Sequence, residues 1–569
     1  MNRTTFAIPS LKILGLSILL SFSFYACRIQ NPQEIGVLAD HAMVVSAHPV
    51  ATKVGLDILK EGGNAFDAAI ATQFALAVVY PAAGNIGGGG FMVARNNRGR
   101  TFALDFREMA PAAANRDMYI DSTGAVIEDL SWFGHLAAGV PGAVAGMQAI
   151  HDSLGSLPWE ALVQPSIDIA AQGVSLTEKE AKQLNEKWEY IQEYNTRPNA
   201  YTQKETWIAG DVILHPELAQ TLKMIRDQKS AGFYEGWVAD SIVAEMQRGG
   251  GLITQEDLKN YRAIWRKPIS GNYRDLRVIS MPPPSSGGIA LLQLLASVEP
   301  YPLAQWGWHD TRTIHLMVEA ERRAYADRAT HLGDPDYYPV PIENLIDTAY
   351  IRQRMADFDP FAASTSVDIA AGQFTESEAT THFSIIDSMG NAVSLTTTLN
   401  GSYGSCVVVG GGGFFLNNEM DDFSAKPGVP NKFGLLGAEA NAIQPGKRML
   451  SSMTPTIVTR NNDLYMVVGT PGGSTIITSV FQNILNVHEF GFSMQTSVAA
   501  PRFHHQWRPD AIFKEATTFS LRDEAKLEAL GHKIYKRGNI GRVDAIWRRP
   551  DGKLEAGADP RGDDSAMGY

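Results

Sequence analysis

The chain is poor in cysteine and has no excess of positive charge. Only Cys27 and Cys406 occur among its 569 residues. Because Cys27 lies in an N-terminal apolar segment, we expect the folded body to hold one thiol and no internal disulfide. The formal net charge of −12 argues against nucleic acid and against an anionic membrane surface as partners.

Long hydrophobic runs are scarce as well. An apolar run at residues 13–26 follows Arg3 and Lys12, but it is too short to span a bilayer comfortably, and no later segment is long and apolar enough. We interpret residues 1–27 as a bacterial-type secretory signal. The residues before Cys27 only partly match a lipoprotein processing site, so an acylated Cys27 and a plain cleavable signal both stay open. We therefore expect an exported protein, either periplasmic or lipid-anchored in the bacterial cell envelope.

What the chain does contain is ordinary globular composition, with 44% hydrophobic and 19% charged residues. Its length suggests several domains. Helical spacing and start and stop signals predict helices at residues 49–60, 65–79, 143–153, 158–172, 177–195, 216–227, 289–298 and 315–327. Strands are expected at residues 91–95, 101–106 and 464–468. Residues 361–379 are interpreted as a mobile linker.

Two stretches of alternating polarity predict a β-hairpin. Residues 380–387 and 391–400 flank a break that ends in Gly390, which suits the positive φ at the end of a three-residue loop. Counting back from this loop pairs Ile385 with Val393, Phe383 with Leu395 and Thr380 with Thr398. Thr380, His382, Thr396 and Thr398 would then share the polar face. Taken alone, the pattern is equally typical of an ordinary half-buried hairpin.

Three other patterns resemble ligand-binding motifs. The glycines of NIGGGG, at residues 85–90, are not followed by the lysine of a phosphate loop, so we interpret them as a tight turn packed near a site. His315 and Glu319 are spaced by four on a charged helix, but no second histidine completes a metal set there, which favours a solvated helix face. The acidic run at residues 419–422 lacks the glycine and distal glutamate of a calcium loop.

Longer motifs carry a family resemblance. TTHFSIID, NAVSLTTTLN, NNEMDDFSAKPGVPN, LSSMTPTIV and GTPGGS resemble the small subunit of a γ-glutamyltransferase. NIGGGGFM, LDFREMAP, GVPGAVAGM, GGLITQEDL and MPPPSSGG resemble its large subunit. The resemblance extends from about Leu38 to the C-terminus. It implies an α+β fold of N-terminal-nucleophile hydrolase type, a four-layer αββα sandwich, in which autocatalytic cleavage between Ala379 and Thr380 yields a large subunit (28–379) and a small subunit (380–569).

The resemblance also implies the roles of particular residues. Thr380 is the expected nucleophile, Thr398 its hydrogen-bond partner, and the backbone N–H groups of Gly472 and Gly473 the oxyanion hole. The substrate's α-carboxylate is assigned to Arg107, Ser451 and Ser452, and its α-amine to Asn400, Glu419 and Asp422. The chemistry suits these residue types, because a guanidinium fork matches a carboxylate and an N-terminal threonine carries its own base, the α-amine.

The implied activity is cleavage of the γ-glutamyl bond of glutathione and related amides, with transfer to an amino acid, a peptide or water. We expect no metal and no organic cofactor. The alternatives are another amidase on the same scaffold, such as a β-lactam side-chain acylase or a polyglutamate-processing enzyme, and a catalytically silent cell-envelope binding protein. Residues 423–438 resemble a lid loop that often presents a tyrosine where this chain has Phe433. We expect a looser lid and an altered ratio of hydrolysis to transfer.

Overall fold

The computed structural model describes residues 33–366 and 380–569. The interpretations of residues 1–27, of Ala379 and of most of the linker therefore lie outside the described residues. Within the described ranges, no helix is both long and apolar enough to cross a membrane.

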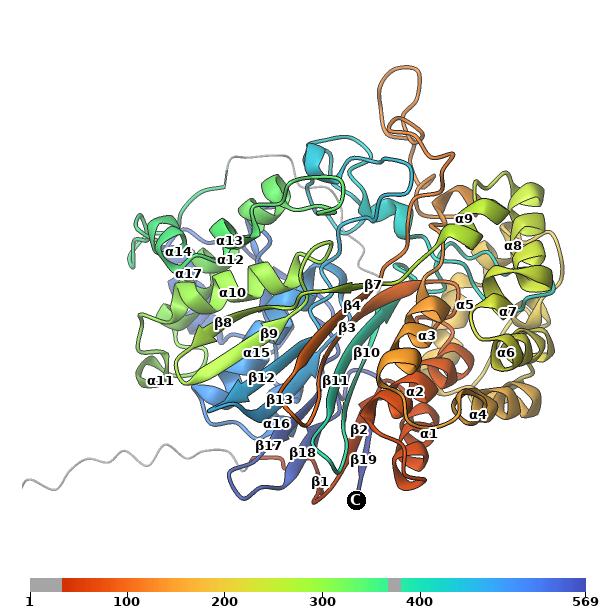
Figure 1. The fold of residues 1–569 in the computed structure, drawn as a ribbon. Helices are drawn as coiled ribbons and strands as arrows, with labels where there is room; N and C mark the ends of the chain where they lie inside the picture. Colours follow the sequence, from red (N-terminus) through yellow and green to blue (C-terminus); the bar gives the residue numbers. More distant parts are fainter. Residues whose placement is uncertain (1–32, 367–379) are drawn as a thin grey trace, which may run out of the picture.

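Two seven-stranded sheets form the centre of the molecule, and every pairing within them is antiparallel (Figure 1). The hairpin sheet contains, in spatial order, β19 (Ser565–Gly568), β2 (Met43–Ser46), β10 (Thr380–Ile386), β11 (Ala392–Thr398), β3 (Gly89–Arg95), β4 (Thr101–Phe106) and β7 (Ile264–Arg266). The second sheet contains β1 (Val37–Ala39), β18 (Leu554–Gly557), β17 (Asp544–Arg548), β13 (Asp463–Gly469), β12 (Thr456–Arg460), β9 (Leu276–Ser280) and β8 (Ile269–Tyr273). Small sheets are formed by β5 (Val174–Ser175) with β6 (Val212–Ile213), and by β14 (Phe503–His504), β15 (Ile512–Lys514) and β16 (Ile534–Lys536).

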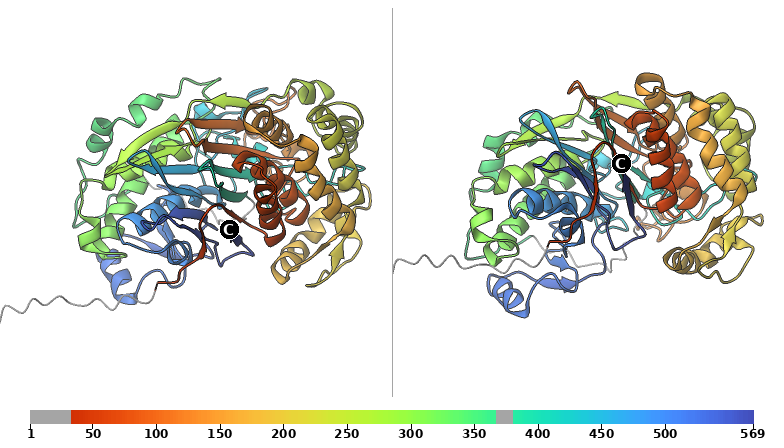
Figure 2. Two further views of the ribbon diagram at one scale, coloured as in Figure 1. Left: turned by 60° about the horizontal axis from the view of Figure 1, so that its bottom comes forward. Right: turned by 90° about the horizontal axis from the view of Figure 1, so that it is seen from below.

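Helices cover the two outer faces of the paired sheets, as the views in Figure 2 show. On the side of the hairpin sheet lie α1 (Pro49–Lys60), α2 (Ala65–Val79), α3 (Ala143–Leu154), α4 (Trp159–Gln172), α5 (Glu178–Glu193), α6 (Pro216–Gln228), α7 (Ala231–Tyr234), α8 (Gly236–Gly249) and α9 (Gln255–Asn260). On the other side lie α10 (Gly287–Val298), α11 (Leu303–Trp306), α12 (Thr311–His331), α13 (Ile342–Leu345), α14 (Thr348–Arg354), α15 (Ile476–His488), α16 (Met494–Ala499) and α17 (Leu521–Ala529). The expected four-layer αββα sandwich is confirmed.

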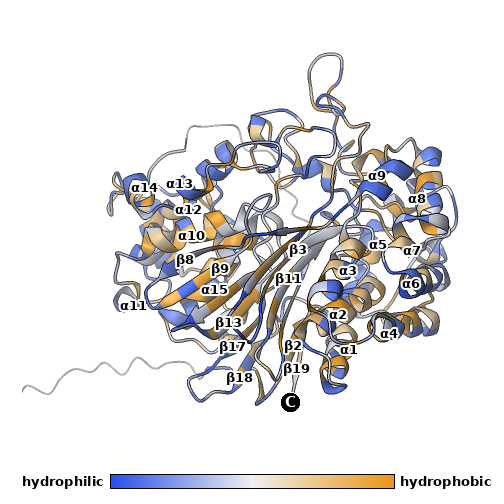
Figure 3. Ribbon diagram, viewed as in Figure 1, coloured by the Kyte–Doolittle hydropathy of each residue, from blue (hydrophilic) through white to orange (hydrophobic). Residues whose placement is uncertain are grey.

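The hydrophobic core is divided by the sheets into three layers. Side chains of the hairpin strands pack against α1 and α2 in one layer, and α10, α12 and α15 pack on the second sheet in another. A thinner layer between the sheets includes Phe91, Ile386, Ile457 and Val467. Figure 3 shows α10 and α15 as largely hydrophobic, which fits the burial of most of their residues against the second sheet and the neighbouring helices. Burial on both faces of each sheet holds the two sheets in a fixed relation.

The predicted hairpin is β10–β11, and its register is confirmed. Thr380 pairs with Thr398, Phe383 with Leu395 and Ile385 with Val393. Gly390 has a φ of 87°, as the loop requires. The half-buried alternative is wrong, because every residue of both strands is buried. The hairpin lies in the middle of its sheet, and its polar face meets the second sheet, where the Ser394 hydroxyl donates to the carbonyl of Val468 at 3.0 Å.

The predicted helices and strands appear, most of them within a residue or two of the expected bounds. The clearest start signal is Asn64, whose side chain accepts from the N–H of Asp67 while the Asp67 carboxylate accepts from the N–H of Asn64. One interpretation is wrong. His315 and Glu319 on α12 are 1% and 0% exposed, so this face of the helix is not solvated. Apolar neighbours on α12 belong to the core, and Glu319 is paired with Arg323 inside the protein.

Candidate active site

Two threonine hydroxyls meet at the open end of the hairpin. Thr380 begins β10 and Thr398 ends β11, and their Oγ1 atoms are 3.3 Å apart. The backbone N–H of Asn400 donates to the Thr398 hydroxyl at 2.7 Å. Either hydroxyl of this pair can donate to the other, because the Thr398 oxygen keeps a second lone pair beside the one that accepts from Asn400. Asn400 has a φ of 69°, a backbone conformation that asparagine tolerates better than most residues.

The glycine-rich turn supports this pair from behind. The Asn85 side-chain N–H₂ donates to the Thr397 hydroxyl at 3.0 Å and to the carbonyl of Thr398 at 2.9 Å. Its side-chain oxygen accepts from the N–H of Gly88 at 3.1 Å. A Cβ on Gly88 would lie 2.0 Å from the Thr398 carbonyl oxygen, so only glycine fits here. The expectation of a tight turn packed near a site is confirmed, whereas the part played by Asn85 was not foreseen.

A second glycine pair lies where β13 leads into α15. Gly472 and Gly473 have φ values of 132° and 52°. A Cβ on Gly473 would approach the Phe433 ring to 2.8 Å, and one on Gly472 would approach the Thr475 hydroxyl to 2.6 Å. Both the backbone conformation and the lack of space therefore demand glycine. Gly473 lines the same cavity as Thr380, whereas Gly472 is not among its lining residues.

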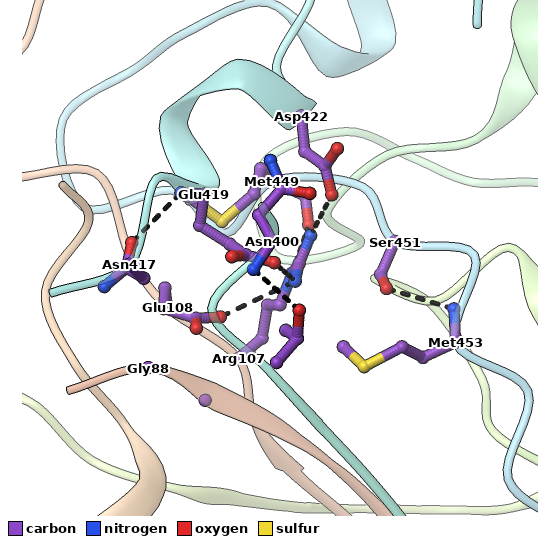
Figure 4. A network of polar contacts seen from close by, with 12 residues as sticks. Gly88, Arg107, Glu108, Asn400, Asn417, Glu419, Asp422, Met449, Ser451 and Met453 are labelled. Atoms are coloured by element: carbon purple, nitrogen blue, oxygen red, sulfur yellow. Dashed lines mark hydrogen bonds and ion pairs between the residues drawn. The ribbon is translucent and has the colours of Figure 1, made fainter. Parts of the chain in front are cut away.

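Arg107 follows β4 and is the centre of a buried charge cluster (Figure 4). One end of its guanidinium fork donates to Glu419 and the other to Asp422. Glu108 lies beside it, with a carboxylate oxygen 3.6 Å from Nη1. The hydroxyl of Tyr261 donates to the backbone carbonyl of Arg107 at 2.8 Å, which fixes the point where the side chain leaves the sheet.

The electrostatics of this cluster follow from three carboxylates, two of them buried and that of Asp422 with its side chain 14% exposed, around one buried guanidinium. Burial raises the pKa of Glu419 well above its usual range, and the neighbouring Glu108 adds to the effect while Arg107 opposes it. Burial likewise raises the pKa of Asp422, again against Arg107, and raises that of Glu108 to about 7. Although burial opposes it, the three carboxylates together raise the pKa of Arg107, which stays charged. The cavity therefore holds a fixed cation with hydrogen-bond acceptors on two sides.

A further arginine reaches the same cavity from α12. Arg328 donates to the Ser452 hydroxyl at 3.1 Å and to the Ser286 hydroxyl at 3.0 Å. Burial lowers the pKa of Arg328 from its ordinary value, and the neighbouring Tyr325 and Asp422 oppose that shift. Sequence reasoning missed this residue because the expected helix ended at residue 327 and its charged face was interpreted as solvated. The apolar residues on several sides of α12, which indicate a buried helix, were the signal that could have found it.

Phe433 lines the cavity from the loop at residues 423–438, which resembles a lid loop. Its ring packs edge-to-face on Trp132, with centroids 5.6 Å apart, and is 5% exposed. The Gln506 side chain donates to the carbonyl of Phe433 at 3.2 Å, and the N–H of Lys432 donates to Asp421 at 3.2 Å. The free volume beneath is about 20 Å³, room for about one water molecule. The looser lid stays a prediction.

Nearly all of the expected site residues come together. Nine of the ten line one cavity: Arg107, Thr380, Thr398, Asn400, Glu419, Asp422, Ser451, Ser452 and Gly473. The structure adds Arg328, Leu435, Met453 and Ile476 to that lining. Among the described residues, one group of histidines and carboxylates is close enough together to be able to hold a metal ion, and this group, His315, Glu319 and His532, lies outside the cavity.

Comparison with known proteins gives this geometry a family. The sequence pattern described as "Gamma-glutamyltranspeptidase" matches residues 51–569. The chain belongs to the γ-glutamyltranspeptidase family. This member is 45% identical over 538 residues to "Glutathione hydrolase proenzyme" of Escherichia coli strain K12, covering 94% of this chain and 93% of the relative. It is 47% identical over 529 residues to the protein of the same name from Pseudomonas aeruginosa, covering 92% and 94%.

Solved structures agree on the architecture of this γ-glutamyltranspeptidase family member. The crystal structure of cephalosporin acylase from Bacillus halodurans is similar with a TM-score of 0.83 and 28% sequence identity. The likeness covers 95% of this chain and 98% of that one. The four-layer fold is thus shared with an acylase, so the choice of substrate must be argued from the cavity.

Proposed function

We propose that this protein cleaves the γ-glutamyl bond of glutathione and related γ-glutamyl amides, with Thr380 as the nucleophile. Its relatives at 45% and 47% identity are named glutathione hydrolase proenzymes. The observation that carries the proposal is the placement of the Thr380–Thr398 pair in one cavity with the Arg107, Glu419 and Asp422 cluster. Reactive hydroxyl and amino-acid recognition chemistry therefore share one enclosed space.

The first step of the mechanism frees the threonine. The chain cuts itself between Ala379 and Thr380, which gives a large subunit (28–379) and a small subunit (380–569) from one precursor. The new α-amine of Thr380 then serves as the base for its own hydroxyl. This self-cleavage is the only protease activity that we assign to the protein.

Acyl transfer then proceeds in two steps, formation of a γ-glutamyl ester on Thr380 and its breakdown. The Thr380 Oγ attacks the γ-carbonyl carbon, the α-amine takes the hydroxyl proton, and the bond from carbon to the amide nitrogen breaks as that nitrogen receives the proton. Water, or the amine of an amino acid or peptide, attacks the resulting γ-glutamyl-threonine ester and restores the hydroxyl. Thr398 holds the nucleophile, and the N–H groups of Gly472 and Gly473 stabilise the oxyanion in both steps.

The head group of the substrate fits the two signs of charge in the cavity. Arg107, with Ser451 and Ser452, would bind the α-carboxylate, and Arg328 would reinforce this pole through its hydrogen bond to Ser452. Glu419, Asp422 and Asn400 would accept hydrogen bonds from the α-ammonium. Because Glu419 and Asp422 already contact Arg107, both poles of the substrate are expected to insert into an existing ion-pair cluster.

The similarity to a cephalosporin acylase makes hydrolysis of a β-lactam side-chain amide the second candidate activity. The carboxyl oxygens around Arg107 favour an α-amino-acid head group over a simple dicarboxylic acyl group, because only the former brings an ammonium that can donate hydrogen bonds to them. The test compares γ-glutamyl and glutaryl anilides, which differ by the amine. Strong preference for the γ-glutamyl compound supports the proposal. Equal rates would favour an acylase, and no hydrolysis of either would favour a silent binding protein.

We also propose that the protein is exported to the bacterial cell envelope, with residues 1–27 as the signal. Support comes from the sequence alone: basic residues, a short apolar run, and Cys27 at its end. Cell fractionation of wild type and Cys27→Ser, with a labelled fatty acid in the medium, tests this. Label on the wild type alone indicates a lipid anchor. Unlabelled protein in the periplasm indicates a plain signal, and protein confined to the cytoplasm would contradict export.

A further inference from the structure

Two histidines and a glutamate from distant parts of the chain meet beside α12. His315 and Glu319 lie on successive turns of α12, and His532 follows α17 after a glycine with a φ of 104°. We call these three residues the two-histidine cluster. They are 1%, 0% and 5% exposed, and their ligand atoms lie within 4.8 Å of one another. Figure 1 shows α12 and α17 side by side, and the two helices are in contact.

The hydrogen bonds of His315 fix the tautomer of its ring and leave one ring nitrogen with a free lone pair. Its Nε2 lies 2.8 Å from the backbone carbonyl oxygen of Asp359, so Nε2 carries the hydrogen and donates it. Nδ1 is then left with a lone pair, which points at Nε2 of His532 at 2.7 Å. A backbone carbonyl that fixes the tautomer of a histidine is the usual outer partner of a metal-ligating imidazole.

Glu319 supplies a carboxylate to the same point. Its oxygens accept from Arg323 at 2.6 Å, from the N–H of Ser364 at 3.1 Å and from Arg322 at 3.3 Å. The two arginines are themselves paired elsewhere, Arg323 with Asp357 and Arg322 with Asp510. Among these five charged groups the carboxylates, Glu319, Asp357 and Asp510, therefore exceed the guanidiniums by one.

We propose that the two-histidine cluster binds a first-row divalent cation of the zinc type. Two imidazole nitrogens and one carboxylate oxygen are a common protein ligand set for Zn²⁺, with water as the fourth ligand. The ion would take the place of the hydrogen shared between the rings, and that hydrogen would move to Nδ1 of His532. Binding of the ion forms or breaks no bond to carbon and needs no oxidant.

The site would join two segments of the chain that flank the expected cleavage point. His315 and Glu319 precede it and His532 follows it, so the ion would bridge the two subunits. The segment at 359–366 is held by the same group of residues: Asp359 accepts from His315, and Ser364 donates to Glu319. This bridging role rests on the proposed cleavage, whereas ion binding itself does not.

The test measures zinc binding to the full-length protein. Protein dialysed against a chelator is titrated with zinc chloride by calorimetry, and the bound metal is counted by mass spectrometry. We expect about one zinc ion per molecule. The His532→Gln variant keeps a donor for the hydrogen bond to His315 but offers a poor ligand. We expect its zinc affinity to fall by more than about 100-fold, since loss of an outer partner alone costs about 10–100-fold.

The matched control is His41→Ala, which removes an exposed histidine and should bind zinc as the wild type does. Cobalt in place of zinc gives a second readout, because tetrahedral coordination should produce intense visible absorption in the wild type and in the two control variants but not in His532→Gln. Thr380→Ala should also bind zinc normally, so a failure of cleavage cannot be mistaken for a failure of this site. Absence of zinc from the wild type, or undiminished binding by His532→Gln, would overturn the proposal.

Discussion

Replacement of Arg107 by lysine is the most informative change in the binding cavity. Lysine keeps the positive charge that three buried carboxylates require, so the fold should survive. It loses the planar fork that contacts Glu419 with one nitrogen and Asp422 with another. The expected effect is therefore on substrate recognition. Arg107→Ala would be less informative, because it would leave the carboxylates without any counter-charge.

The magnitude follows from the hydrogen bonds at stake. A buried hydrogen bond to a charged group contributes about 1.5–3 kcal/mol, and Arg107 is 1% exposed, so solvent does not compensate for its loss. We expect kcat/KM for a γ-glutamyl anilide to fall roughly 10–150-fold. Arg116→Lys is the control, because Arg116 at the exposed surface also donates with both nitrogens of its fork, in its case to the single carboxylate of Glu439. It should change kcat/KM by less than about twofold.

The assay compares two substrates. A γ-glutamyl anilide carries the α-carboxylate, and a 4-aminobutanoyl anilide lacks it while keeping the amine. Wild-type protein should prefer the first, and Arg107→Lys should lose most of that preference while its rate on the second changes little. An equal loss on both substrates would refute the reasoning, because it would mean that Arg107 supports the cavity without contacting the carboxylate.

Further predictions concern the support, the charge and the lid of the cavity. Asn85→Asp replaces the donor to the Thr398 carbonyl by an acceptor, so kcat should fall about tenfold or more with little change in KM; a change confined to KM would contradict this. Glu108 has a pKa of about 7 in the folded protein, against an ordinary value of 4.5. Between these two pH values the folded protein keeps a proton on Glu108 that the unfolded chain has lost. As the pH rises through this window, the buried carboxyl therefore destabilises the folded state increasingly, by up to about 3 kcal/mol. Glu108→Gln should therefore raise the calorimetric unfolding temperature more at about pH 8 than at about pH 5; an equal gain at both would count against the shifted pKa. Phe433→Tyr should add a hydroxyl that can hydrogen-bond to Asn400 and hold the lid closed, which should reduce hydrolysis relative to transfer about 2–10-fold. An unchanged ratio of the two products would show that Phe433 does not control this ratio.

Local signals in the sequence were sufficient for the hairpin and for the helix starts. The register of β10 and β11 followed from the alternation and from Gly390, because a shift by one residue would have put every apolar side chain on the wrong face. Asn64 marked the start of α2 because its side chain satisfies backbone N–H groups at that point. The sandwich of two sheets came from the family resemblance, since periodicity within a strand does not say which sheet it joins.

Contacts between distant segments could not be read in this way. The pairing of His315 with His532 joins residues 217 positions apart, so no second histidine was in sight and this charged helix face looked solvated. Arg328 was missed for the same reason. The direct contacts of Arg107 with Glu419 and Asp422 were also unforeseen, because the resemblance assigned them to opposite ends of a substrate and said nothing of their mutual attraction.

The central claim is that Thr380 becomes a chain start and acts as the nucleophile. Intact mass and N-terminal sequencing of the purified protein, with Thr380→Ala alongside, test it most directly. The account predicts two pieces in the wild type, the smaller beginning at Thr380, and a single uncut chain in the variant. A wild-type chain that stays in one piece, or a variant that is cut as efficiently as the wild type, would contradict it.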